Sequence, residues 1–254
     1  MTLKTENKKQ TAIVTGASTG IGYAITQRFL DDGMNVIMNA RTQADLADAY
    51  EKLGSPDNAV CVTGDISKKE TGEALVEKAI QAFGGVDVLI NNAGVFNPKP
   101  FLETEEADLD RFLSINFKGA YFTTQAVVPE IIKQGGGSIV NIGTTLLEHA
   151  IAGFPASGAL ASKAALHSLT EQLAAELGQF NIRVSAIATG IIDTPLHPKQ
   201  GIDEVNSLAG LHLLNRIGIS ENMSDAVAML VKNDFITGTT LRVDGGHAAG
   251  HAFG

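Results

Sequence analysis

The chain has 254 residues, 44% apolar and 19% charged, a composition that favours a folded globular protein over a disordered one. Its net charge of −9 argues against a nucleic-acid-binding protein, which needs a basic surface. Cys61 is the only cysteine, so no disulfide can form within the chain, and no apolar run approaches the roughly 20 residues of a membrane span. Residues 1–10 are polar and lack the apolar segment of a secretory signal. We therefore expect a cytoplasmic protein that binds no membrane, no nucleic acid and no metal.

Short runs rich in β-branched residues predict seven strands, at residues 11–15, 35–38, 59–62, 86–90, 138–142, 183–188 and 239–243. Stretches with helical spacing lie between them, at residues 21–32, 44–53, 69–83, 105–134, 159–180 and 224–231. This alternation predicts a parallel sheet with helices on both faces. We expect one doubly wound α/β domain over residues 1–254, with a polar N-terminal tail at residues 1–10.

The first predicted strand runs into a glycine-rich turn and then into a helix. Gly16, Gly20 and Gly22 allow a tight turn, close approach of the backbone to a pyrophosphate, and close packing of the helix on the strand. The N-terminus of the following helix offers free N–H groups to a phosphate. The same glycines could form an ordinary turn, but their place between the first strand and the first helix favours nucleotide binding.

The spacing Gly-x-x-x-Gly-x-Gly resembles that of the short-chain dehydrogenase/reductase family. Further motifs of that family follow in the same order, namely Asn91-Asn92-Ala93-Gly94, Asn116, Ser162-Lys163-Ala164-Ala165, and Ile236-Thr237-Gly238 to Val243-Asp244-Gly245-Gly246. The resemblance covers nearly the whole chain. It implies a Rossmann-type fold and hydride transfer between a nicotinamide cofactor and a carbonyl or alcohol.

The resemblance also implies a cofactor site at the loops that follow the strands. Its residues would be Gly16, Ser18, Thr19, Gly20, Ile21, Gly22, Arg41, Asp65, Ile66, Asn92, Ala93, Gly94, Lys163, Gly190, Ile192 and Thr194. Relatives that prefer NAD carry an acidic residue where this chain has Ala40, and Arg41 beside it could pair with a 2′-phosphate. We predict NADP(H), with NAD(H) as the alternative. Arg41 could also be an ordinary solvated residue, and Asp65 could be a helix cap before Ser67 instead of, or as well as, a cofactor contact.

Family members catalyse with Asn, Ser, Tyr and Lys. Asn116 and Lys163 match two of these, and Thr144 falls at the Ser position and keeps a hydroxyl, although Thr145 is a rival for that role. The Tyr that gives a proton to the carbonyl oxygen should lie four residues before Lys163, where this chain has Ala159. A positioned proton donor contributes about 10²–10⁴ in rate.

Three explanations of Ala159 remain open. The residue could have been engineered into an ordinary reductase. Another acid could serve, and His149, on the loop before the Ala159 helix, is the best candidate. The protein could instead bind the nucleotide and reduce nothing, as a sensor or scaffold. His149 could also be a simple exposed loop residue.

The resemblance places the substrate beside Leu146 and His149, with a substrate-loop insertion at about residues 193–217. The expected lining is mostly apolar, which favours a neutral or partly hydrophobic small carbonyl compound. The long helix at residues 105–134 and the small-residue face of the helix at residues 159–180 resemble the paired helices through which family members form tetramers. We therefore expect a homotetramer.

Overall fold

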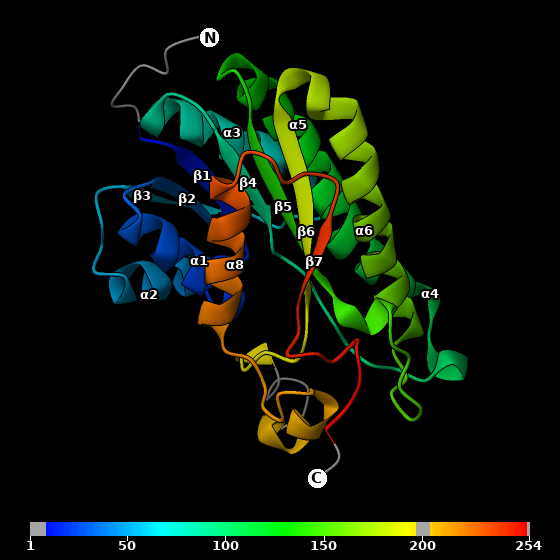
Figure 1. Cartoon of the computed structure of the whole chain (residues 1–254). Coiled ribbons are helices and arrows are strands. Elements are labelled where there is room, and N and C mark those ends of the chain that lie inside the picture. The colour runs from blue at the N-terminus through cyan, green and yellow to red at the C-terminus, as the bar shows by residue number, and fades with distance from the viewer. Residues whose placement is uncertain (1–8, 197–203, 253–254) are drawn as a thin grey trace.

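In the computed structural model, which describes residues 9–196 and 204–252, seven strands form one parallel sheet with the order β3-β2-β1-β4-β5-β6-β7. The predicted fold class is therefore confirmed. The strands are β1 (Thr11–Thr15), β2 (Asn35–Ala40), β3 (Ala59–Thr63), β4 (Val88–Asn91), β5 (Gly137–Thr144), β6 (Ile182–Thr189) and β7 (Thr240–Val243). Each neighbouring pair runs parallel, because every connection is a crossover on one face of the sheet (Figure 1).

Helices cover both faces of the sheet. On one face lie α1 (Gly20–Asp31), α2 (Gln43–Lys52) and α8 (Ser220–Lys232), whose apolar side chains pack with Val14 and Met38. On the other face α3 (Lys69–Phe83) and α5 (Ala120–Lys133) pack with Ile13 and Ile37, and α6 (Ser157–Leu177) lies beside them (Figure 1). Consecutive residues of one strand point to opposite faces, which explains why these strands are apolar throughout.

The long helix predicted at residues 105–134 is not continuous. It consists of α4 (Glu106–Phe112), a π-helical segment η2 (Leu113–Gly119), and α5. A π turn holds an extra residue, and such turns are frequent at functional sites. The helix predicted at residues 159–180 starts two residues earlier, at Ser157, and ends in a short 3-10 turn, η4 (Gly178–Phe180).

A buried polar network joins the centre of the sheet to its helices. Asn91 Nδ2 donates to Asn141 Oδ1 at 2.8 Å and to Thr124 Oγ1 at 3.0 Å, and Asn141 Nδ2 donates to Thr170 Oγ1 at 2.9 Å. All four residues are buried, so each lost partner would leave a buried polar group unsatisfied. The network fixes β4 and β5 relative to α5 and to α6, the helix that carries Lys163.

The chain after β7 folds back against the segment that follows β6. Residues 204–214 include a 3-10 helix, η5 (Val205–Leu211), and the backbone N–H of Ala252 donates to Gly210 O at 3.2 Å. Figure 1 shows the C-terminal segment returning to this helix at one end of the molecule. Part of the predicted substrate loop, residues 197–203, and most of the predicted tail, residues 1–8, lie outside the described residues. In the described ranges, no helix is long and apolar enough to cross a membrane.

Candidate active site

The strand order creates a switch point between β1 and β4. The chain proceeds from β1 to β2 and β3 on one side, and from β4 to β5, β6 and β7 on the other. Ligands of doubly wound sheets bind at such a point, beyond the carboxyl ends of the strands. The predicted phosphate loop follows β1, and Asn92, Ala93 and Gly94 follow β4. The fold therefore brings these two predicted cofactor segments together.

The phosphate loop has no room for side chains at its glycines. Gly16 and Gly20 have φ values of +65° and +55°, a region that residues with a Cβ rarely adopt. A Cβ at Gly22 would overlap the carbonyl oxygen of Gly16 and the side-chain amide of Asn92. The side chain of Thr19, the N-cap of α1, makes no capping hydrogen bond. The first N–H groups of α1 are thus of the kind that binds phosphate at a helix N-terminus.

Thr15 and Asn92 hold the ends of β1 and β4 together. Asn92 Nδ2 donates to the carbonyl oxygens of Thr15 and Gly16 at 2.9 and 3.0 Å. The Thr15 hydroxyl donates to Ile90 O at 3.2 Å and accepts from the backbone N–H groups of Asn92 and Ala93, both at 3.0 Å. These bonds fix the phosphate loop against the segment that follows β4.

The end of β2 carries no acidic side chain. Ala40 is buried there, and the exposed Arg41 follows it. Asp65, after β3, accepts a hydrogen bond from the backbone N–H of Ser67 at 2.9 Å, and this bond lowers the pKa of its carboxyl. Asp65 therefore caps a turn and not the N-terminus of α3, whose N-cap is Lys68, and the predicted contact of Asp65 with the cofactor stays a prediction. The side chain of Ile66 is buried and belongs to the core cluster on the α3 and α5 face of the sheet.

The segment after β6 lies next to the phosphate loop. The N–H of Gly190 donates to Val243 O at 3.1 Å, and the buried Ile192 forms an isolated bridge with Gly218. A Cβ at Gly20 would lie 3.2 Å from the side chain of Thr194. Of the three residues predicted here for cofactor binding, Thr194 therefore lies beside the phosphate loop.

Asn116 is buried in the π-helical segment η2 and its side chain is fully engaged. Its Oδ1 accepts from Val95 N at 2.8 Å, and its Nδ2 donates to Val95 O at 2.9 Å and to Ser162 Oγ at 2.8 Å. The Ser162 hydroxyl in turn donates to Ala159 O at 2.7 Å. Asn116 and Ser162 therefore tie α6 to the chain after β4. Sequence analysis identified Ser162 only as part of a motif, because nothing in the motif shows its partner.

Lys163 lies where β4, β5 and α6 meet. Its Nζ donates to Ile142 O at 2.8 Å. A Cβ at Gly94 would lie 3.1 Å from both Lys163 Nζ and Asn116 Oδ1, so these two groups converge on one glycine. Burial lowers the pKa of Lys163 to about 8. The ammonium form still predominates at neutral pH and can bind a hydroxyl or a negative charge.

The structure distinguishes Thr144 from Thr145. Thr145 is buried, and its hydroxyl donates to Thr189 O at 3.1 Å, inside the sheet. Thr144, at the end of β5, is half-buried, and its hydroxyl oxygen accepts from Leu146 N at 3.3 Å. The Thr144 hydroxyl can still donate its proton to a ligand. Thr144 is therefore the better match to the predicted role.

Ala159 is buried, with 1% of its surface exposed, in the first turn of α6. The helix predicted at residues 159–180 begins instead at Ser157, so Ala159 lies within its first turn rather than at its start. A Cβ on the neighbouring Gly158 would lie 3.0 Å from the side chain of Leu109 in α4. No group that can donate a proton occupies position 159.

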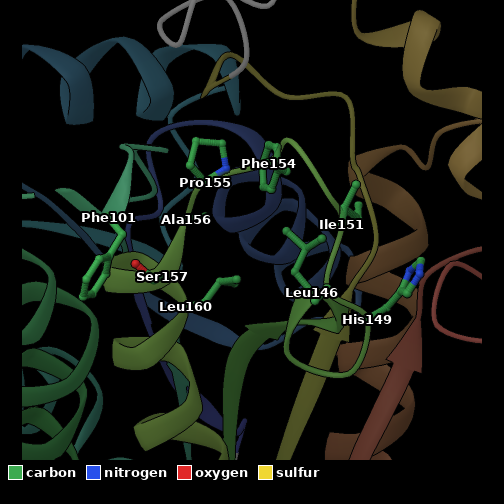
Figure 2. A pocket seen from close by; sticks show the side chains of 10 residues that line it. Phe101, Leu146, His149, Ile151, Phe154, Pro155, Ala156, Ser157 and Leu160 are labelled. Carbon is green, nitrogen blue, oxygen red and sulfur yellow. The ribbon is translucent and has the colours of Figure 1, made fainter. Parts of the chain in front are cut away.

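Leu146 and His149, the predicted substrate residues, line one cavity of about 280 Å³. Figure 2 shows His149 and Phe101 at opposite ends of this cavity, with the ring of His149 directed away from Phe101. Mostly apolar residues complete the lining: Phe101, Ala150, Ile151, Phe154, Pro155, Ala156, Ser157 and Leu160. A second cavity of about 600 Å³ adjoins the turn after β6, where Ile191, Ile192 and His212 contribute to its wall.

Four histidines gather between these cavities, a cluster that sequence reasoning missed. The ring centroid of His149 lies 4.6 Å from that of His251 and 5.3 Å from that of His247, and His247 lies 5.3 Å from His212. His212 Nε2 accepts from the backbone N–H of Ile191 at 3.1 Å. These histidines come from three separate loops, so no local sequence pattern shows that they meet.

Comparison with known proteins identifies the family. A family model described as short chain dehydrogenase matches residues 10–204. An uncharacterized oxidoreductase of Schizosaccharomyces pombe is 38% identical, over 94% of this chain and 91% of its own. The 3-oxoacyl-[acyl-carrier-protein] reductase FabG of Thermotoga maritima is 33% identical, over 92% of this chain and 96% of its own. The chain belongs to the short-chain dehydrogenase/reductase family.

A solved structure of the same fold supports the assignment to this family. A blue fluorescent protein from a metagenomic library, solved in complex with NADPH, superposes with a TM-score of 0.85 and 32% identity. The alignment covers 94% of this chain and 98% of that one. That structural neighbour, which shares the fold of this chain, was solved with NADPH bound.

Buried histidines give a testable dependence of stability on pH. Burial lowers the pKa of His167, His212 and His247 below 6.5, and neighbouring imidazoles lower that of His247 further. As the pH falls below 6.5, the unfolded chain therefore takes up protons before the folded one. We predict that the free energy of unfolding decreases as the pH falls below this value, by up to about 1.4 kcal/mol per pH unit for each histidine.

Urea unfolding at pH values from about 8 down to about 5 measures this slope. His247→Phe removes one of the three groups, so its slope should be smaller than that of the parent. A free energy of unfolding that stays constant down to about pH 5 would contradict the prediction.

Proposed function

We propose that the protein is an NADP(H)-dependent oxidoreductase that transfers a hydride between the nicotinamide and the carbonyl or alcohol carbon of a small, mainly apolar molecule. The observation that carries this proposal is the convergence of Lys163 and Asn116 on Gly94, beside the phosphate loop. The family and its NADPH-bound structural neighbour support the class of cofactor. The apolar lining of the cavity beside Leu146 supports the class of substrate.

The residues at the switch point fit a dinucleotide. The glycines at 16, 20 and 22 form a cradle that any Cβ would fill, and the N-terminus of α1 has no side-chain cap. These groups would hold the pyrophosphate, while Lys163 and the segment after β4 would hold a ribose. When bound, the nicotinamide supplies the hydride. The chain's own part is to bind and orient the reactants and to provide a proton.

Ala159 is the one departure from the family's set of four catalytic positions that removes a functional group. The carbonyl oxygen must gain a proton when the hydride arrives, and Ala159 cannot give one. Either turnover is about 10²–10⁴-fold slower, which is the rate contribution of one general acid, or another group donates the proton. His149, in the wall of the cavity, is the candidate for that group.

A protein that binds NADPH without turnover, as a sensor or scaffold, is the second candidate function, and Ala159 favours it. Binding and turnover separate the two. NADPH titrations followed by nicotinamide fluorescence measure binding, and loss of NADPH with a panel of aromatic and aliphatic aldehydes and ketones measures turnover. Reduction of any member supports the oxidoreductase. Tight binding with no reduction across the panel supports the sensor.

Arg41→Ala tests the preference for NADP(H). Arg41 is exposed directly after the buried end of β2, where it can pair with a 2′-phosphate. We predict that the parent binds NADPH several-fold more tightly than NADH, and that Arg41→Ala weakens NADPH binding by about ten-fold or more. NADH binding should not change. Arg111→Ala, an exposed arginine on α4, is the matched control, and equal affinity of the parent for both cofactors would refute the proposal.

We also infer that the protein is a homotetramer. Apolar side chains remain exposed on α4, η2 and α5, including Leu109, Leu113 and Tyr121. Small residues such as Ala161 and Ala164 are exposed on α6. Light scattering at micromolar concentration should give about four times the mass of the chain, and Leu113→Glu should reduce it. A monomeric mass of the parent would exclude this inference.

Ala159→Tyr tests whether only the proton donor is missing. The substitution restores a phenol one helical turn before Lys163. A site with no other proton donor predicts carbonyl reduction roughly 10²-fold faster or more, whereas a site in which His149 already donates the proton predicts little gain. NADPH affinity should change little, because the cradle for the pyrophosphate lies elsewhere.

Ala159→Phe is the matched control, since it adds the same ring without the hydroxyl. Position 159 is buried, so thermal unfolding of both variants shows whether the ring is accommodated. No gain with Tyr, together with a loss of turnover in His149→Ala, would show that the proton takes a different route.

A further inference from the structure

The histidine cluster, defined as His149, His212, His247 and His251, contains buried ring nitrogens without protein partners. Among the described residues, Nδ1 of His149, Nδ1 of His212 and both ring nitrogens of His247 are buried and unpaired. His247 is 1% exposed. Buried polar atoms are normally satisfied, because each unmade hydrogen bond costs about 1–3 kcal/mol. Four ring nitrogens on three neighbouring imidazoles lack protein partners beside two cavities, which points to a role other than packing.

Hydrogen bonds at two corners of the cluster assign the ring tautomers. His212 Nε2 accepts from Ile191 N, so this nitrogen carries no proton and the proton lies on Nδ1. His251 Nδ1 lies 3.2 Å from Leu211 O, an atom that can only accept, so this Nδ1 carries a proton. The other nitrogen of His251 is then free to take up a second proton. His251 is half-buried, whereas His212 and His247 are buried, so His251 connects the cluster to solvent.

The position of the cluster relates it to the group that the site lacks. His149 lines the predicted substrate cavity, and its ring is closest to that of His251, at 4.6 Å between centroids. At this spacing, ring nitrogens can exchange protons directly or through one water molecule. The route from solvent to the cavity would thus pass through His251 and His149, with His247 in contact with both.

The charged groups that face the cluster do not block this role. Asp244, whose carboxylate accepts from the N–H groups of Gly246 and Ala248, favours the charged form of His212 and His247. Arg216 opposes it at His212. Glu148, next to His149, is paired with Arg242. Both acidic and basic groups therefore face the cluster, and neither Asp244 nor Glu148 holds one of its rings in a fixed ion pair.

We propose that His149 donates the proton that position 159 cannot, and that His251 and His247 return a proton to His149 from solvent. This inference rests on the proposed oxidoreductase function. The hydride of the bound cofactor goes to the carbonyl carbon, and the proton of the His149 imidazolium goes to the carbonyl oxygen. The products are the alcohol, the oxidised cofactor and a neutral His149, which regains one proton from water by way of His251. Here His149 is a catalytic residue, whereas His251 and His247 act through it.

Two substitutions separate proton supply from packing. His251→Gln keeps a donor for Leu211 O but cannot pass a proton. His247→Phe keeps an aromatic ring and loses no protein hydrogen bond, because neither nitrogen of His247 has a protein partner among the described residues. With NADPH and 4-nitrobenzaldehyde as probes, we expect each variant to lower kcat about ten-fold or more, with the KM of the aldehyde unchanged. Added imidazole should restore kcat. Ala249→Ser, on the exposed turn between the two histidines, is the control.

A second measurement does not depend on turnover. In protein labelled with ¹⁵N in its histidine rings, NMR gives the rate at which the ring protons exchange with solvent. Proton supply through His251 predicts that His251→Gln slows exchange at the buried His247 about ten-fold or more. A cluster that only packs predicts exchange limited by local opening, which His251→Gln would not slow.

A double substitution gives the sharpest comparison. In the Ala159→Tyr background a phenol supplies the proton, so His251→Gln should no longer lower kcat. Reduction that persists unchanged in His251→Gln and His247→Phe, with only a shift in thermal stability, would overturn this inference and leave the oxidoreductase function standing. A parent that binds NADPH but reduces no member of the carbonyl panel would overturn both.

Discussion

The candidate site depends on the hydrogen bonds that Asn92 Nδ2 donates to the carbonyl oxygens of Thr15 and Gly16. The backbone pairing of β1 with β4 ends at Val14 and Ile90, and beyond it the two segments leave toward opposite sides of the sheet. The Asn92 amide continues the pairing past that point. It also explains the glycine at position 22, since a Cβ there would occupy the space between the amide and the loop. Without this bond, the loop and the end of β4 would lose their common position.

A second chain of bonds preserves the geometry of an active site around a missing group. Val95 binds the Asn116 amide, that amide binds the Ser162 hydroxyl, and the hydroxyl binds the carbonyl oxygen of Ala159. The backbone at position 159 is therefore held by the same residues that hold Lys163 on α6. Because these contacts do not involve a side chain at 159, the loss of a phenol leaves them intact. The change at this position is chemical rather than structural, which is why the proton, and not the binding of reactants, is the step in question.

Sequence reasoning succeeded where the determinant is local. Runs such as residues 11–15 must be strands in a covered sheet, and the glycines at 16, 20 and 22 define a loop by what their missing side chains permit. It failed where the determinant is distant. The helical spacing of residues 105–134 hides the π turn, because the extra residue is stabilised by the contact of Asn116 with Val95 and Ser162. Thr144 and Thr145 have the same hydroxyl, and only the folded chain shows that Thr145 binds Thr189 O of β6 while Thr144 accepts from Leu146 N.

Sequence analysis could not predict the histidine cluster, because its determinants are also distant along the chain. The electrostatics of the cluster bear on its role. Its members come from the loop after β5, the turn after η5 and the segment after β7, which only the folded chain brings together. Rings separated by 4.6 to 6.1 Å repel one another when charged, and burial adds to the cost of each charge. The first proton is therefore bound more easily than any later one. A carbonyl reduction consumes a single proton, so a cluster that binds a first proton more easily than a second is suited to supply it, and it would need no residue at position 159 to deliver it.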